Sequence, residues 1–192
     1  EQGFEPLAIC SLLGKIGTSD PIEARPSMEV LANEFSFDKI GRSPARFDED
    51  ELLLINGRLL HDMPYESVKA HLESLNVGGG EAFWNVIRSN ISKVVDTSGW
   101  STMLYAPMPG VIDDEDRAFC EAAANALPDE ITDSTWSEWT STLKVDHARK
   151  GRALFMPLRK ALTGRERGPE MGPILTLLGA EKAKARLLGE TA

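Results

Sequence analysis

Apolar residues recur at helical spacing along most of the chain, and this periodicity limits the fold more than any other feature. Residues 151–164 show it best, because a mostly apolar segment is interrupted there by Arg152, Arg159 and Lys160. The apolar members are Ala153, Leu154, Met156, Pro157, Leu158, Ala161 and Leu162. Thr163-Gly164 is expected to end this helix, and residues 165–169 to form a loop. No segment alternates as a half-buried strand does, so the sequence predicts an all-α fold.

Capping residues and prolines predict where several helices begin. We expect a first helix over residues 4–16, and a short one that Ser27 caps and that runs to Phe35. Asp48 and Glu51 form a pair resembling a capping box ahead of the clearest helix. Pro64 is expected at the first position of the next helix. Further helices are predicted over residues 119–127, around Trp136 and Trp139, and over residues 174–178 and 180–188.

The charge is unevenly distributed. The chain carries a net charge of -9, which argues against a general phosphate binder. Residues 144–167, however, contain eight Lys and Arg against two Asp and Glu, whereas residues 113–138 contain nine acidic residues and only Arg117 as a cation. This pattern fits a protein that touches RNA at one place and repels it elsewhere. On charge alone, a solvated charged face is the favoured explanation.

The residues that usually carry catalysis or bind metals form no recognisable motif. The histidines are His61, His71 and His147, and none has a nucleophile and an orienting group at motif spacing. We therefore assign no catalytic residue. His61 and His71 are expected on neighbouring helices with acidic residues close in the sequence, so a metal site stays open there, but scattered surface histidines are favoured and we assign no metal. Gly78-Gly79-Gly80 lacks the strand and the Lys-Ser or Lys-Thr pair of a phosphate cradle. Cys10 and Cys120 are far apart in the sequence and are expected to be reduced core thiols.

Two observations concern the cellular context. The longest aliphatic run, Leu52 to Ile55, is far shorter than a membrane span, so we expect a cytoplasmic protein without a membrane partner. The first residue is Glu1 rather than Met, which suggests a piece of a longer protein. We expect the chain to be a monomer.

Two blocks of sequence resemble one family. ALFMPLRKALTG, followed by RGPEM, ILTLLG and EKAKARL, is similar to the C-terminal anticodon-binding segment of bacterial-type glutamyl-tRNA synthetases, which are class I aminoacyl-tRNA synthetases. FSFDKIGRSPARFDEDELLLINGRLL is similar to an earlier part of the same region, with Ile55-Asn56 at the family's Leu-Asn position. The blocks occur in the family's order, and the resemblance covers nearly the whole chain.

The resemblance implies an organisation in three parts. Residues 1–62 would end the stem-contact region, and residues 63–106 and 107–192 would form two cage-like helical bundles that bind the anticodon. It also implies that the helix after Asp48 continues through Asn56-Gly57. The two sequence signatures of the family that hold ATP are absent. We therefore expect no cofactor in this chain, with ATP and Mg²⁺ bound by the catalytic domain of the parent enzyme.

The resemblance also implies a partner and a site. The partner is tRNA for glutamate, and a parent enzyme that also charges tRNA for glutamine stays open. The anticodon-contacting residues of the last bundle correspond to Arg159, Thr163, Arg165, Pro169 and Met171. In the first bundle, Arg88 and Asn90 are expected on a helix whose end faces the anticodon. Some family members read the third anticodon base with an arginine, and Asn90 or Arg88 would take that position here.

A different class of function stays open from the residues themselves. A noncatalytic helical module can hold a protein partner in apolar grooves, and an acidic surface with several tryptophans would suffice for it. Trp136 and Trp139 are three residues apart on one predicted helix, and we interpret that pair as core rather than as a platform for bases. Salt-sensitive binding of tRNA would distinguish the two classes.

Overall fold

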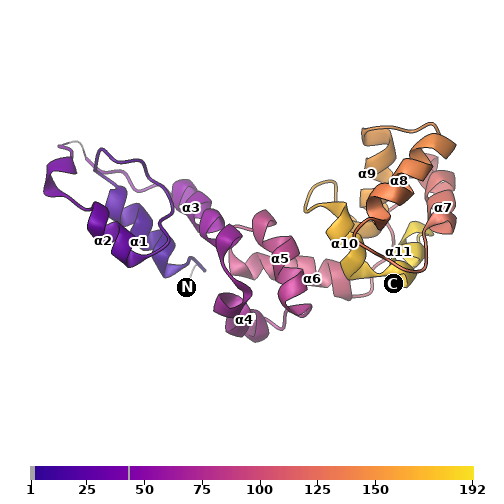
Figure 1. The fold of residues 1–192 in the computed structure, drawn as a ribbon, viewed down its shortest axis with the longest axis horizontal. Coiled ribbons are helices and arrows are strands. Elements are labelled where there is room, and N and C mark those ends of the chain that lie inside the picture. The colour runs from indigo at the N-terminus through magenta and orange to yellow at the C-terminus, as the bar shows by residue number, and fades with distance from the viewer. Residues whose placement is uncertain (1–2, 43) are drawn as a thin grey trace. The chain divides into compact units, whose positions relative to one another are not determined.

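The computed structural model describes residues 3–42 and 44–192, and over these residues it is built of helices joined by loops (Figure 1). No strand is present in the described part, which contains only two isolated bridges, Thr18 with Ile40 and Pro109 with Thr191. The predicted all-α fold is confirmed. No helix in these residues is long and apolar enough to cross a membrane.

The contacts divide the chain into two compact units. Unit 1 comprises residues 1–77 and 87–98, and unit 2 comprises residues 78–86 and 99–192. The expected three-part division at residues 62 and 106 follows family likeness rather than contacts, and it stays a prediction.

The described residues of unit 1 form α-helices and short 3-10 turns. The α-helices are α1 (Pro6–Lys15), α2 (Met28–Glu34), α3 (Glu49–Asp62) and α4 (Tyr65–Ser74), and the turns are η1 (Phe37–Lys39), η2 (Arg88–Asn90) and η3 (Val94–Asp96). Its core forms where α1 packs on α3, with Ala8 and Leu12 against Leu52 and Ile55.

The predicted helix starts in unit 1 are close to those observed. Ser27 accepts a hydrogen bond from the Val30 amide at the start of α2, and Asp48 accepts one from the Asp50 amide at the start of α3. Pro64 is the residue before α4 rather than its first residue, because α4 begins at Tyr65.

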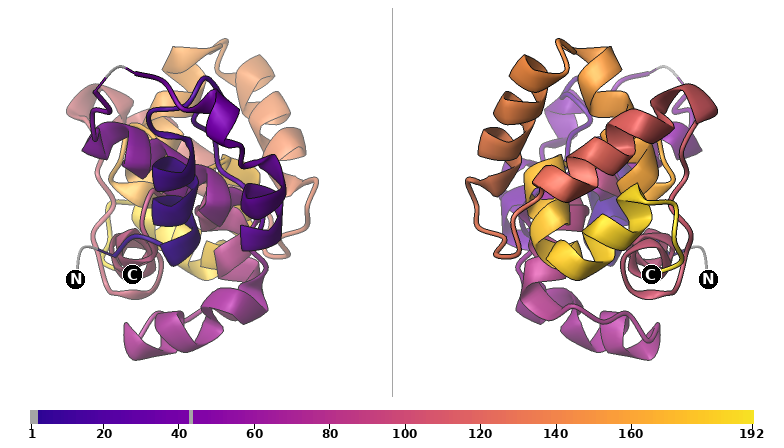
Figure 2. Two further views of the ribbon diagram at one scale, coloured as in Figure 1. Left: turned by 90° about the vertical axis from the view of Figure 1, so that its left-hand side faces the viewer. Right: turned by 90° about the vertical axis from the view of Figure 1, so that its right-hand side faces the viewer.

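Unit 2 is a bundle formed mainly by the last five helices. It contains α7 (Arg117–Ala126), α8 (Thr135–Asp146), α9 (Arg152–Thr163), α10 (Met171–Leu178) and α11 (Ala180–Leu187), with the turn η4 (Asp114–Asp116) before α7. Two further helices, α5 (Gly80–Ile87) and α6 (Thr97–Tyr105), lie mostly in this unit. Helix α11 contacts α7, α9 and α10, as the yellow, orange and salmon ribbons of Figure 2 show.

Three predictions about single residues need correction. The α-helix that carries Phe83 ends at Ile87, so Arg88 and Asn90 lie in the short 3-10 helix η2 that follows it rather than on that α-helix itself. Cys120 is a buried free thiol whose pKa burial raises to about 11, but Cys10 is only half-buried. Trp139 is core, whereas Trp136 is only partly buried.

A buried lysine organises an ion network in unit 1. Lys15 is 3% exposed, and its ammonium lies 2.6 Å from a Glu34 oxygen and 2.9 Å from an Asp20 oxygen. Its hydrogen bonds to Glu34 and then to Asp20 raise the pKa of Lys15. The Lys15 bond is the main cause that lowers the pKa of each carboxylate, with Lys39 adding to the effect on Asp20 and Arg25 to that on Glu34.

We expect unit 1 to lose stability in acid because of this network. Carboxylates whose pKa is lowered by folding stabilise the fold above their ordinary values, 4.5 for Glu34 and 3.8 for Asp20, and lose that contribution as the pH falls below them. Hydrogen exchange of α1 and α2, corrected for the intrinsic pH dependence of exchange, should therefore show protection that weakens as the pH falls from about 5 to about 3, the range in which ordinary carboxylates titrate. Lys15→Met should flatten this dependence, and an unchanged slope in that variant would contradict the assignment.

Candidate nucleic-acid interface

The end of α9 and the loop after it bring five of the expected site residues together in unit 2. Gly164 ends α9 in the left-handed conformation, with φ of 65°, and its amide donates to the Lys160 carbonyl. The Thr163 hydroxyl donates to the Arg159 carbonyl at 2.7 Å and accepts from the Arg165 amide at 3.2 Å. Thr163 is 3% exposed, so these hydrogen bonds hold the turn together from the buried side of the loop.

Arg159 connects this helix to the far end of the loop. Its Nη2 donates to the Pro169 carbonyl at 3.0 Å, and burial lowers the pKa of the guanidinium. Pro169 is buried and Met171, the first residue of α10, is 5% exposed. These two residues therefore shape the surface beside Arg159 and present little of their own side chains.

Arg165 is held against α6. Its guanidinium lies 4.0 Å from the centre of the Trp100 ring and donates to the Gly99 carbonyl at 3.0 Å. Gly168 lies on the same ring, because a Cβ at that position would come within 2.4 Å of Trp100. Trp100 thus fixes both sides of the loop, and Arg165 helps to position it.

Arg88 and Asn90 belong to unit 1. The Arg88 guanidinium donates to the Met63 carbonyl at 3.0 Å and is half-buried. Asn90 is exposed, and its amide nitrogen donates to the Ser89 hydroxyl at 3.0 Å. Of the two, Asn90 presents the more accessible polar side chain.

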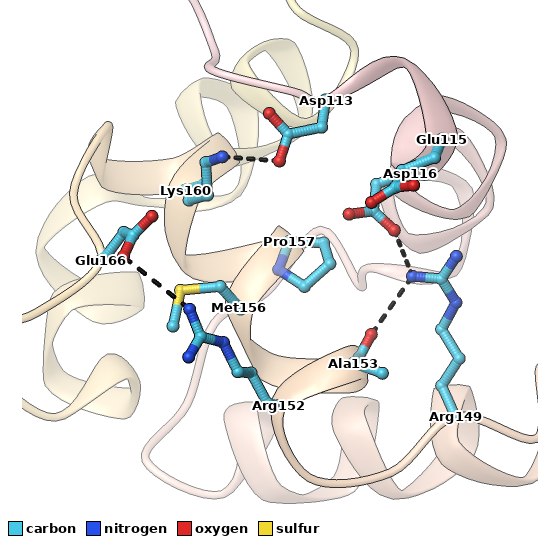
Figure 3. Close-up of a pocket in the computed structure, with 10 residues that line it drawn as sticks. All are labelled: Asp113, Glu115, Asp116, Arg149, Arg152, Ala153, Met156, Pro157, Lys160 and Glu166. Carbon is cyan, nitrogen blue, oxygen red and sulfur yellow. Dashed lines mark hydrogen bonds and ion pairs between the residues drawn. The ribbon is translucent and has the colours of Figure 1, made fainter.

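A cavity of about 720 Å³ borders α9 and is lined by both cationic and acidic side chains (Figure 3). The Lys160 ammonium lies 2.6 Å from an Asp113 oxygen, and that hydrogen bond raises the pKa of Lys160. Arg149 pairs with Asp116, and Arg152 lies 3.9 Å from Glu166. Three of the eight cations in residues 144–167 are therefore paired with carboxylates, and two of these carboxylates, Asp113 and Asp116, belong to the acidic segment 113–138.

Arg149 also compensates for a proline. Pro157 is inside α9 and lacks an N–H, so the Ala153 carbonyl loses its helical donor. The Arg149 guanidinium donates to that carbonyl at 3.2 Å, as Figure 3 shows. This residue stabilises α9, so its charge does not mark a site for phosphate.

Another cavity, of about 450 Å³, borders Arg159 itself. Trp136 and Phe155 line it, and sequence reasoning selected neither residue for the site. Phe155 precedes Arg159 by four residues, about one helical turn, which puts both on one face of α9. This spacing is the feature of the sequence that could have pointed to Phe155. No group of three or more His, Cys, Asp or Glu residues that could hold a metal ion occurs in residues 3–42 and 44–192.

Comparison with known proteins assigns a class to this bundle. Residues 112–189 match the family described as "Anticodon binding domain", which covers α7 to α11 and the loop after α9. Unit 2 therefore contains a domain of the anticodon-binding class.

The relatives are more specific. The chain is 50% identical over 188 residues to glutamate–tRNA ligase 2 of Hyphomonas neptunium, covering 97% of the chain and 42% of that relative. It is 46% identical over 191 residues to glutamate–tRNA ligase 1 of Maricaulis maris, covering 99% of the chain and 42% of that relative. A crystal structure of a glutamate tRNA ligase from Elizabethkingia meningosepticum shares the fold, with a TM-score of 0.79 at 20% identity over 97% of the chain and 41% of that structure.

The chain is thus similar over nearly its whole length to the C-terminal portion of glutamate–tRNA ligases, and its residues 112–189 match the anticodon binding domain. It spans about 42% of the length of the two relatives.

Proposed function

We propose that this chain binds the anticodon arm of tRNA as part of a glutamate–tRNA ligase, which attaches glutamate to tRNA with the use of ATP. The match of residues 112–189 to the anticodon binding domain carries the proposal. ATP and Mg²⁺ would be bound by the catalytic part of the longer enzyme. The enzyme would act as a monomer in the cytoplasm, where translation takes place.

The loop after α9 supplies the recognition groups in this proposal. Arg159 and Arg165 present guanidinium groups, and a guanidinium is suited to base edges and phosphates. Thr163, Pro169 and Met171 contribute by fixing the backbone and the walls around them, since all three are buried. Arg88 and Asn90 would contact the anticodon from the other unit.

Arg159→Ala is expected to weaken binding of glutamate tRNA by about 1–3 kcal/mol, because the guanidinium bonds a base edge. A filter-binding titration at two salt concentrations measures the change, and circular dichroism checks that the bundle persists without the bond to Pro169. Arg117→Ala is the matched control, since Arg117 is an exposed arginine of the same unit that pairs with Asp114. Unchanged affinity in a folded Arg159→Ala protein would exclude Arg159 from the interface. Salt-insensitive binding of a peptide, in place of salt-sensitive binding of tRNA, would favour a protein partner instead of RNA.

Asn90→Arg is expected to sharpen selection between glutamate and glutamine tRNAs, which differ at the third anticodon base. An asparagine amide offers both donors and acceptors, whereas a guanidinium offers only donors in a fixed plane. The chain as it stands should therefore discriminate weakly and accept glutamine tRNA to some extent. Stem-loops that differ only in the third base test this. A strong preference in the unmodified chain that the substitution leaves unchanged would assign the reading to Arg88 or to unit 2.

A further inference from the structure

One indole of α6 contacts both halves of the loop that follows α9. Trp100 is 7% exposed, and it lies in the same compact unit as that loop. The Arg165 guanidinium lies 4.0 Å from the centre of the Trp100 ring, and its Nη2 donates to the Gly99 carbonyl at 3.0 Å. A guanidinium is attracted to the face of a tryptophan ring, so the ring and the carbonyl together select one orientation of Arg165.

The backbone in the second half of the loop lies against the same ring. A Cβ at Gly168 would come within 2.4 Å of Cη2 and 3.1 Å of Cζ3 of Trp100. Gly168 also has a φ of 148°, a conformation that glycine adopts far more readily than any other residue. The main chain of the loop therefore packs directly on the indole, at a position where a side chain has no room.

This second contact reaches Arg159 through the next residue of the loop. Pro169 follows Gly168 and is buried, and its carbonyl accepts a hydrogen bond from Nη2 of Arg159 at 3.0 Å. A shift of Gly168 on the ring would move that carbonyl, and with it the guanidinium that the carbonyl holds. Trp100 thus acts on Arg165 by direct contact and on Arg159 through two residues of backbone.

We propose that Trp100 is a positioning residue for tRNA binding, which fixes Arg159 and Arg165 in their binding orientations before the tRNA arrives. This inference rests on the proposed function, and it adds a residue of α6 that lies outside the segment 112–189 that matches the anticodon binding domain. Long side chains lose conformational freedom when they bind a partner, and side chains that are already fixed lose less. Trp100 therefore raises the affinity for tRNA without contacting it.

The test measures binding of the glutamate-tRNA anticodon stem-loop to the whole chain by fluorescence anisotropy. Trp100→Leu should weaken binding about 5- to 150-fold, the cost of ordering two arginine side chains during binding instead of beforehand. Trp100→Phe should have an affinity between the two, because it keeps a smaller ring. Phe119→Leu is the matched control and should leave the affinity unchanged. It removes a buried ring of the same unit that lies 4.2 Å from the Arg149 guanidinium, and neither residue belongs to the loop.

Two further measurements separate positioning from a general loss of structure. In double-mutant cycles, Trp100→Leu should cost less affinity in a chain that carries Arg159→Ala than in the unmodified chain, and also less in a chain that carries Arg165→Ala. In NMR spectra of the free protein, the ring should shift the proton signals of the Arg165 side chain upfield. Trp100→Leu should remove this shift, whereas Phe119→Leu should keep it.

The outcomes distinguish this inference from the proposed function. If the unmodified chain binds the stem-loop and Trp100→Leu binds it equally well, the positioning role is wrong while the proposed function stands. The same holds if Trp100→Leu costs as much in both arginine variants as in the unmodified chain. If the unmodified chain does not bind the stem-loop, the proposed function fails and this inference fails with it. Should Trp100→Leu fail to fold, Trp100→Phe decides by the same cycles.

Discussion

Gly110→Ala is expected to destabilise unit 2 by about 3 kcal/mol or more, because the added carbon has no room. A Cβ at Gly110 would come within 1.7 Å of the Arg186 carbonyl oxygen and 2.7 Å of its carbon. Both atoms belong to the backbone of α11, so the clash cannot be relieved by rotating a side chain. The chain around residue 110 or the end of α11 has to move.

Urea unfolding followed by tryptophan fluorescence measures this effect. All four tryptophans, Trp84, Trp100, Trp136 and Trp139, lie in unit 2, so the signal reports on that unit. Gly78→Ala is the matched control in the same unit, because no atom lies within 4 Å of a Cβ added there. Equal stability of the two variants would show that the close approach at Gly110 is not a constraint on the fold.

Arg186→Ala is expected to lower the stability of unit 2 by a similar amount, about 3 kcal/mol. The Arg186 side chain is fully buried, and its Nη1 donates to the Leu162 carbonyl at 2.8 Å while its Nη2 donates to the Ala192 carbonyl at 3.2 Å. Alanine leaves a cavity and also leaves the Leu162 carbonyl, at the end of α9, without this donor. Burial lowers the pKa of the guanidinium.

Two further variants separate packing from hydrogen bonding at this position. Arg186→Met keeps most of the volume and removes only the donors, so it should cost about 1–3 kcal/mol, less than alanine. Lys184→Ala, on the same helix, removes an ion pair with exposed Asp129 and should change the unfolding curve little. If methionine and alanine have equal effects, the hydrogen bonds rather than the packing hold α9 and α11 together.

Sequence patterns predicted the helices well where the signal is local. Ser27 and Asp48 were recognised as caps, and Gly164 as the end of α9, because each acts on amides or carbonyls only a few residues away. The continuity of α3 through Asn56-Gly57 was predicted from family likeness, and the structure gives its physical reason. The Asn56 side chain accepts from the Glu5 amide and donates to the Ser92 carbonyl, so a residue with turn propensity is fixed by partners far away in the sequence.

The site was less predictable because its contacts join distant segments. The count of cations in residues 144–167 did not show that Asp113 and Asp116 pair with two of them. It also did not show that Arg149 serves the carbonyl that Pro157 leaves free. Likewise, the spacing of Trp136 and Trp139 indicates a shared helix face, but only the packing of α8 on its neighbours decides which ring is covered.

The bridge between Pro109 and Thr191 has a consequence for how such a domain can be passed between proteins. Met108 and Ala192 exchange backbone hydrogen bonds in both directions, at 3.1 and 3.2 Å, on either side of the segment that matches the anticodon binding domain. The two ends of the segment therefore lie side by side. A segment with adjacent ends can be inserted into, or removed from, a host protein without distorting the host. The host chain then has to span only the short distance between the two hydrogen-bonded ends. Transfer of residues 108–192 as a cassette would keep both ends of the bridge and the helices α7 to α11 between them.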